Sequence, residues 1–114
     1  MQLLTEELRA QLPALYGQEK NEDPTVYLKF FTPDSGWTWF VTEGSFVADE
    51  FQFFGYVIGQ FEEWGYFLLR DLAKSRGPMG ARIERELRFK PAPFSEVIKR
   101  HRLQHGERPN KGGH

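Results

Sequence analysis

Aromatic and β-branched residues are concentrated in one continuous part of the chain, from Thr25 to Leu68. Fifteen of the eighteen aromatic residues lie between Tyr27 and Phe67. They fall into short runs that are separated by turn-forming segments, which is the pattern of consecutive β-strands. Connections this short exclude βαβ crossovers, which need about a dozen residues between strands, and they favour an antiparallel meander.

The clearest turn signal is Pro33-Asp34-Ser35-Gly36. Proline presets one backbone angle, aspartate can bond the backbone two residues on, and glycine accepts a positive φ. We therefore expect a hairpin that joins a strand over residues 25–31 to a strand over residues 37–41. Trp37 and Trp39 are two residues apart in the second strand, so we expect both on the same sheet face and mostly buried. All four turn residues have structural roles, and we interpret them as structural rather than catalytic.

The remaining elements follow from periodicity and capping signals. Strands are expected over residues 51–58 and 64–68, and an edge strand over residues 83–89, where apolar and charged residues alternate. Helices are expected over residues 5–12, 69–75 and 95–103, with Thr5 and Ser95 at the starts of the first and last. The sequence thus predicts an α+β fold, with an antiparallel sheet of about five strands and three short helices packed mainly on one face. Residues 1–104 are expected to form a single domain and residues 105–114 a flexible C-terminal tail.

Several classes of protein are excluded or disfavoured by composition. The chain has no cysteine, so it has no disulfide, thiolate nucleophile or cysteine-ligated metal. Glu6, Glu7 and Arg9 interrupt the N-terminal leucines, and no run of about 18 apolar residues occurs. We expect a cytoplasmic protein without membrane association.

Charge is distributed unevenly between the two parts of the chain. Residues 1–69 hold three basic and eleven acidic side chains, whereas residues 70–114 hold twelve basic and five acidic ones. Such polarity is a hint of a nucleic-acid or acidic protein partner, and a solvated mixed-charge surface is the alternative. The candidate partner-binding residues are basic side chains of the expected edge strand and final helix: Arg85, Arg88, Lys99, Arg100 and Arg102. Lys99 and Arg102 are neighbours at three-residue spacing on that helix.

The aromatic residues offer a second binding hypothesis. An aromatic sheet face can stack on bases, as in the RNA-recognition fold. That fold has a helix between its first two strands, whereas Phe31 and Trp37 are separated by a turn too short for one. We therefore interpret the rings mainly as core, because aromatic side chains bury large areas in a small domain. Three short helices cannot cover every ring, so an exposed aromatic stripe remains an alternative.

No catalytic, cofactor or metal motif is present in the sequence. His101 and His105 share one helix face, but two ligands are too few for a metal site, and we expect both side chains to be solvated. The carboxylates near turns leave an uncharacterised hydrolase as the remaining enzyme hypothesis: Asp34, Glu43, Asp49, Glu50, Glu62 and Glu63. We predict a non-enzymatic protein that needs no cofactor.

Several ordered segments together resemble one known family. The segments include Lys29-Phe30-Phe31-Thr32-Pro33-Asp34-Ser35, Trp37-Thr38-Trp39, Phe53-Phe54-Gly55, Gly65-Tyr66-Phe67 and Arg76-Gly77-Pro78. Over about residues 2 to 98 the chain resembles the small bacterial family known as domain of unknown function 2958. The signature residues that we interpret as structural are Phe31, Pro33, Asp34, Trp37, Trp39, Arg76, Gly77 and Pro78.

The resemblance implies an accessory protein of plasmids, integrative elements or phages, and it brings no catalytic residues. Residues after Lys99 lie outside the familiar pattern, so their role is particular to this chain. Taken together, these observations predict a non-enzymatic interaction module of a mobile genetic element. Its partner is a protein or a nucleic acid, and nucleic-acid binding through the basic C-terminal helix is the first alternative.

Overall fold

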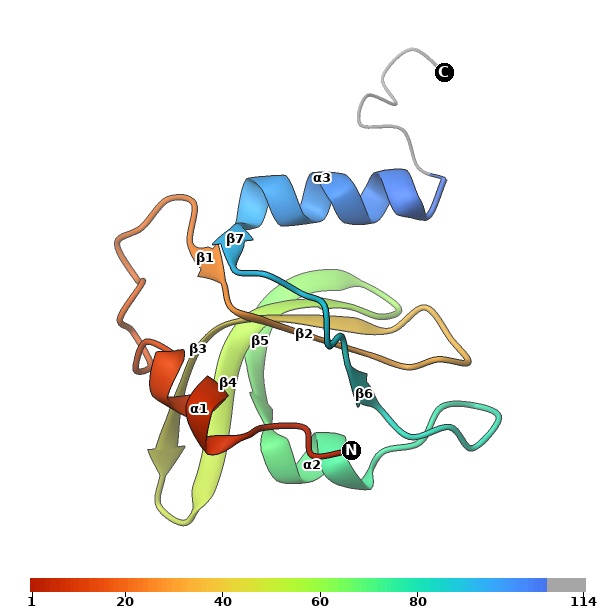
Figure 1. Cartoon of the computed structure of the whole chain (residues 1–114), viewed down its shortest axis with the longest axis horizontal. Helices are drawn as coiled ribbons and strands as arrows, with labels where there is room; N and C mark the ends of the chain where they lie inside the picture. The colour runs from red at the N-terminus through yellow and green to blue at the C-terminus, as the bar shows by residue number, and fades with distance from the viewer. Residues whose placement is uncertain (107–114) are drawn as a thin grey trace.

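The computed structural model describes residues 1–106 and places them in three helices and two antiparallel sheets (Figure 1). The main sheet contains β2 (Leu28–Phe31), β3 (Thr38–Val47), β4 (Glu50–Ile58), β5 (Glu62–Leu68) and β6 (Glu84–Arg85). The small sheet pairs β1 (Thr25–Val26) with β7 (Ala92–Pro93). The helices are α1 (Glu6–Gln11), α2 (Leu69–Lys74) and α3 (Phe94–Gln104). From residue 107 on, the predicted tail lies outside the described residues.

The main sheet has the order β5-β4-β3-β2-β6, and all neighbouring strands are antiparallel. The predicted α+β class and the meander of four consecutive strands are therefore confirmed. The predicted last strand does lie at an edge, but it is only two residues long. The Glu86 amide still donates to the Lys29 carbonyl of β2. A turn then follows, in which the Phe89 amide donates to the Glu86 carbonyl, and the chain leaves the sheet. No helix in the described residues is long and apolar enough to span a membrane.

Strand β3 is the centre of the sheet, and every residue from Thr38 to Gly44 is buried. Successive side chains in a strand point to opposite faces, so this run requires cover on both sides of the sheet. Its backbone also approaches β4 closely. A Cβ atom at Gly55 would lie 1.8 Å from the Phe40 carbonyl oxygen, so glycine is required there.

One face of the sheet carries the larger core. Its buried residues come from β2, β3 and β4, from the segments around α1, from α2 and from the residue before β6: Leu3, Leu12, Leu28, Phe30, Trp39, Val41, Phe51, Phe53, Leu72 and Ile83. The predicted cap of α1 is present, since Thr5 Oγ1 accepts a hydrogen bond from the Leu8 amide. Two of the three helices therefore contribute to this side.

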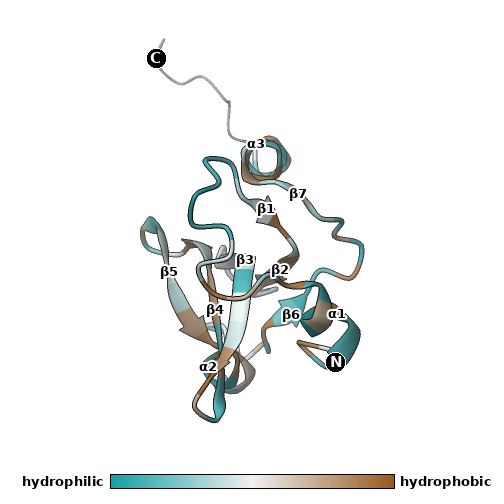
Figure 2. Cartoon of the chain, turned by 90° about the vertical axis from the view of Figure 1, so that its left-hand side faces the viewer, coloured by the Kyte–Doolittle hydropathy of each residue, from teal (hydrophilic) through white to brown (hydrophobic). Residues whose placement is uncertain are grey.

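The third and longest helix, α3, belongs to a second core on the opposite face. Val97 is buried there with Val26 and Phe40, and Phe94 packs against the same cluster. Figures 1 and 2 show α3 beyond β1 and β7, at the end of the molecule away from α2. The helix carries both hydrophilic and hydrophobic residues (Figure 2). Because the sheet needs cover on both faces, the helices are divided between them.

Trp37 and Trp39 lie together, with ring centroids 5.8 Å apart and an angle of 29° between the ring planes. Trp39 is 9% exposed, but Trp37 is 40% exposed. The prediction that both are mostly buried is therefore wrong for Trp37. Trp37 precedes β3 at the end of the sheet, where its ring lies against Trp39 and Gly59 and remains partly open to solvent.

This difference predicts unequal costs of truncation. Trp39→Ala should lower the free energy of unfolding by about 3 to 5 kcal/mol, because it leaves a cavity in the core. Trp37→Ala should cost markedly less, because part of that ring is already hydrated. Chemical denaturation of the two variants and the wild type measures both values, and equal losses would contradict the packing described here.

Candidate functional site

A concave basic pocket lies where α3, β2 and the segment 86–90 meet. Its volume is about 320 Å³. The basic pocket is defined by its lining residues: Lys29, Phe40, Glu86, Arg88, Phe89, Lys90, Val97, Arg100, His101 and Gln104. Four of these side chains are cationic at neutral pH and one is a carboxylate. The pocket therefore presents an excess of positive charge around an apolar floor.

Of the four cations, Lys29 lies deepest in the sheet. It belongs to β2, which pairs with the central strand β3. Its side chain is half-buried, and its Nζ lies 5.9 Å from the centroid of the Phe40 ring. Burial lowers the pKa of Lys29, and the nearby Glu86 carboxylate opposes this effect. A partly desolvated ammonium group over an aromatic ring is stabilised by an additional anion at short range.

The turn after β6 positions two more cations. The Glu86 amide donates to the Lys29 carbonyl at 2.9 Å, and the Arg88 amide donates to Glu86 Oε1 at 3.1 Å. These bonds fix the start of the segment that carries Arg88 and Lys90 to the rim of the basic pocket. Both side chains belong to exposed residues, so they are accessible to a ligand from solvent.

Helix α3 forms the remaining wall of the basic pocket. Arg100 reaches the pocket and also pairs with Glu96 one turn earlier on the same helix. His101 is buried, and its ring meets the edge of the Phe40 ring at a centroid distance of 5.4 Å. The expectation of a solvated histidine is therefore wrong for His101, because this side of α3 faces the sheet. His105 is exposed, as expected.

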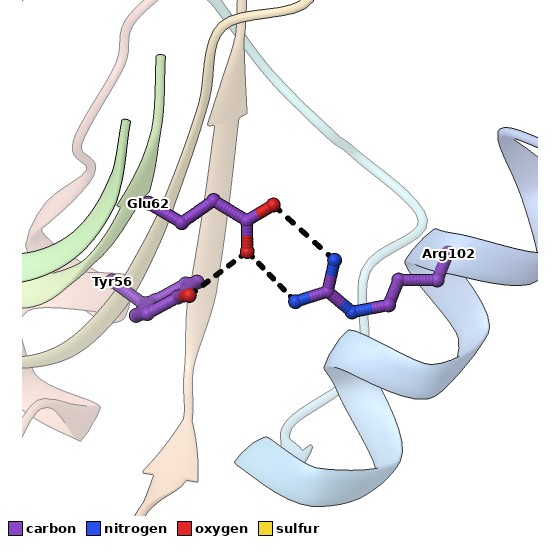
Figure 3. Close-up of polar contacts among 3 residues, drawn as sticks. All are labelled: Tyr56, Glu62 and Arg102. Atoms are coloured by element: carbon purple, nitrogen blue, oxygen red, sulfur yellow. Dashed lines mark hydrogen bonds and ion pairs between the residues drawn. The ribbon is translucent and has the colours of Figure 1, made fainter. Parts of the chain in front are cut away.

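Arg102 faces a different part of the sheet, where it binds Glu62 through two bonds (Figure 3). Its Nη2 lies 2.7 Å from Glu62 Oε1, and its Nη1 lies 3.2 Å from Oε2. The Tyr56 hydroxyl donates to the same Oε1 at 2.9 Å. The Arg102 hydrogen bond is the main cause of a lowered Glu62 pKa, with a further contribution from Tyr56. Arg102 thus joins α3 to β5 and does not line the basic pocket.

The other predicted binding residues are divided in the same way. Lys99 is exposed on α3 next to Arg100, outside the pocket lining. Arg85 donates to the carbonyl oxygens of Gln2 and Leu3, so it holds the N-terminal segment. Of the five predicted residues, the structure brings Arg88 and Arg100 together in one site.

Sequence reasoning missed Lys29 and His101 as members of this site. Lys29 is one of only three cations in residues 1–69, and it lies in a strand at a half-buried position between buried residues. That isolated cation was the available signal. Its approach to Arg88 depends on the pairing of β2 with β6, which the sequence does not specify.

Two of the family-signature residues, Asp34 and Gly77, meet at a different feature, the contact between two loops. Asp34 Oδ2 accepts hydrogen bonds from the amides of Met79 at 2.8 Å and Ala81 at 3.2 Å. A Cβ atom at Gly77 would lie 1.6 Å from Asp34 Oδ1, so a side chain there would displace the Asp34 carboxylate from its position. This geometry supports a structural role for Asp34 and Gly77. For Pro33, Arg76 and Pro78 the structural interpretation stays a prediction. Phe31 ends β2 beside the first of these loops.

The carboxylates of the hydrolase hypothesis do not form one site. Glu43 accepts from the amides of Tyr16 and Gln18, and Glu50 pairs with Arg70 at 3.0 Å. Asp34 and Glu62 have the separate partners described above. Within residues 1–106, no group of three or more histidine, aspartate or glutamate side chains is arranged to hold a metal ion.

Comparison with known proteins gives one result. A family model described as "Protein of unknown function (DUF2958)" matches residues 3–105. No curated protein and no solved structure matches the chain.

The structural role of Asp34 can be tested against a second turn aspartate. Asp34→Ala removes a charged acceptor from two amides and should lower the free energy of unfolding by about 1.5 to 3 kcal/mol. Asp49→Ala, in the exposed β3–β4 turn, should change it by less than about 0.5 kcal/mol. Chemical denaturation measures both, and an Asp34→Ala variant as stable as wild type would contradict the structural role.

The Glu62–Arg102 contact predicts a pH dependence. A carboxyl group whose pKa is lowered on folding stabilises the protein above its unfolded pKa, here about 4.5, and this contribution is lost as pH falls through the folded pKa. In Arg102→Met, the Glu62 pKa should rise toward 4.5. Carboxyl NMR titration of the wild type and the variant measures the change. The matched variant Arg100→Met should leave the Glu62 pKa where it is, and an unchanged value in Arg102→Met would refute the assignment.

Proposed function

Since the chain belongs to the family described as proteins of unknown function (DUF2958), we propose its function from the geometry of the site: a non-enzymatic interaction module that binds phosphate groups of a nucleic acid in the basic pocket. The observation that carries this proposal is the convergence of Lys29, Arg88, Lys90 and Arg100 on one concave space with a single carboxylate, Glu86. Phosphate contacts supply most of the affinity of nucleic-acid binding that does not depend on sequence.

The composition of the basic pocket suits a phosphate group. Arginine side chains can bind phosphate oxygens through two parallel hydrogen bonds, and lysine binds them as a point charge. The backbone of Lys29 is fixed by β2, and its ammonium group already lies over the Phe40 ring, which reduces the freedom lost when an anion binds. The anion would also offset the desolvation of its ammonium group.

A chain of phosphates suits the surroundings better than one isolated anion. Lys99 is exposed beside Arg100 on α3 and extends the positive surface beyond the pocket. The charge asymmetry of the sequence has the same direction, because the pocket takes three of its four cations from residues 70–114. A polyanion that crosses the pocket would therefore meet additional cations on its path.

The biological setting of the proposal rests on the resemblance alone. We place the protein in the bacterial cytoplasm, as an accessory protein of plasmids, integrative elements or phages. Nucleic acid is the central component of such elements, so a phosphate-binding module fits this setting. The geometry of the pocket is an independent argument, and it is the part that experiments on the purified protein can test.

The proposal predicts salt-dependent binding that depends on the pocket. Wild-type protein should bind single- or double-stranded DNA or RNA, with an affinity that falls as salt rises. In the double variant Arg88→Gln/Lys90→Gln, affinity at low salt should fall about tenfold or more, and the salt slope should decrease by up to about two phosphate equivalents of 0.7 to 0.9 units each. Fluorescence anisotropy at several salt concentrations measures both quantities.

The matched control is Lys20→Gln/Lys74→Gln, which removes the same charge from exposed positions outside the pocket. It should change binding much less. Equal losses in both variants, or no wild-type binding at low salt, would overturn the proposal. Instead, binding to a protein whose affinity depends little on salt, and on one or two residues more than on the others, would favour the protein-binding alternative. If the protein cleaves the labelled nucleic acid when a divalent metal is added, the non-enzymatic part of the proposal would be contradicted.

A further inference from the structure

A second concave surface lies on the same sheet face as α3, between the segment 16–24 and strands β4 and β5. Its volume is about 380 Å³. We name it the aromatic groove and define it by Phe54, Trp64 and Tyr66 on the sheet, and by Tyr16, Glu19 and Glu22 on the facing segment. None of its described lining residues is basic. Its chemistry is therefore opposite to that of the basic pocket.

The wall of the aromatic groove is a continuous set of rings. The Phe54 ring lies 5.9 Å from Trp64, with 15° between the planes, and 4.9 Å from Tyr66. Trp64 is anchored on its other side by Phe94 at the start of α3, with a centroid distance of 4.7 Å. Even so, Trp64 is 39% exposed and Tyr66 is 50% exposed. Grouped aromatic side chains that stay exposed in a small domain indicate an interaction surface.

The facing segment is fixed rather than loosely packed. Glu43, buried in β3, accepts hydrogen bonds from the amides of Tyr16 at 2.8 Å and Gln18 at 2.9 Å. Gln18 Nε2 donates to the carbonyl oxygens of Thr25 and Thr42, each at 2.8 Å. The groove is therefore formed before any ligand binds, which reduces the entropy lost on binding.

The electrostatic environment of the aromatic groove is negative. Glu19, Glu22 and Glu43 all line it. A hydrogen bond with Tyr16 is the main cause of a raised Tyr66 pKa, and the charges of Glu43 and Glu19 raise it further. Aromatic faces attract cations through their quadrupole, and nearby carboxylates add to this attraction. The groove therefore complements a cationic group with a flat, polarisable surface.

From this complementarity we infer that the aromatic groove is a docking site for an arginine side chain on an extended segment of a protein partner. A guanidinium group stacks on aromatic faces and binds carboxylates through two parallel bonds, and the groove provides both. The extended segment follows from the sheet topology. Strand β5 is the edge of the sheet, so its outer backbone groups can pair with an added strand.

Gly65 in β5 supports this arrangement. It lies between Trp64 and Tyr66, and a Cβ atom there would meet nothing within 4 Å. Internal packing therefore does not require glycine at this position. Glycine in the middle of a strand often marks a place where another backbone approaches closely. In a partner strand beside β5, alternate side chains would point toward the groove. An arginine at one of these positions would enter it.

The test uses a capped pentapeptide, Thr-Val-Arg-Val-Thr, and versions with citrulline or lysine in place of arginine. Citrulline keeps the shape of arginine without its charge. The indole N–H signal of Trp64 reports binding locally by NMR. We expect a saturable shift with the arginine peptide, affinity about fivefold or more weaker with citrulline, and an intermediate value with lysine. N-acetyl-arginine amide should bind more weakly than the peptide, because it lacks the strand.

Variants of the protein provide the matched comparison. Glu19→Gln/Glu22→Gln and, separately, Tyr66→Leu should each weaken the arginine peptide about fivefold or more. Glu6→Gln/Glu7→Gln removes the same charge from exposed positions on α1 and should leave the affinity unchanged. Equal binding of the citrulline or lysine peptide, an equal loss in the α1 variant, or no saturable shift at millimolar peptide would overturn the inference. A peptide no tighter than the amino-acid amide would overturn its strand component.

Discussion

The central strand β3 is buried on both of its faces, and this burial determines where the helices pack. From Thr38 to Gly44, no residue of β3 is exposed, so each face of the sheet needs its own cover. The N-terminal leucines and α2 cover one face. On the other face, Val97 of α3 packs with Phe40 and Val26, and Phe94 extends this contact toward Trp64. One helix is too narrow to cover that whole face, and the basic pocket and the aromatic groove are the concave regions beside it.

The contacts that hold α3 are polar as well as apolar. Asp23 accepts hydrogen bonds from the amide and hydroxyl of Ser95, and so caps the helix from a distant segment. Arg102 joins the other end of the helix to Glu62 on β5. These contacts connect the acidic first part of the chain to the basic second part at defined points. Beside α3, four cations line the basic pocket and three carboxylates line the aromatic groove.

Much of the fold could be predicted from the sequence because its signals are local. The turn at Pro33–Gly36, the alternating runs and the Thr5 cap specified the order of strands and the start of α1. The site could not be predicted to the same degree, because its members meet only through long-range pairing. The β2–β6 pairing brings Lys29 beside the segment 86–90. Arg102 binds Glu62, which lies forty positions away in the sequence. A count of basic residues on one helix does not contain that information.

The phosphate-binding pocket that we propose lies between α3 and the segment 86–90 on this face of the sheet. Backbone amide NMR shifts during titration with a short oligonucleotide at low salt test it most directly. If phosphates bind in this pocket, saturable shifts should be concentrated at Lys29 and within residues 86–90 and 97–104. Shifts confined to the aromatic groove, shifts spread evenly over the exposed lysines and arginines, or no saturable shift would contradict it.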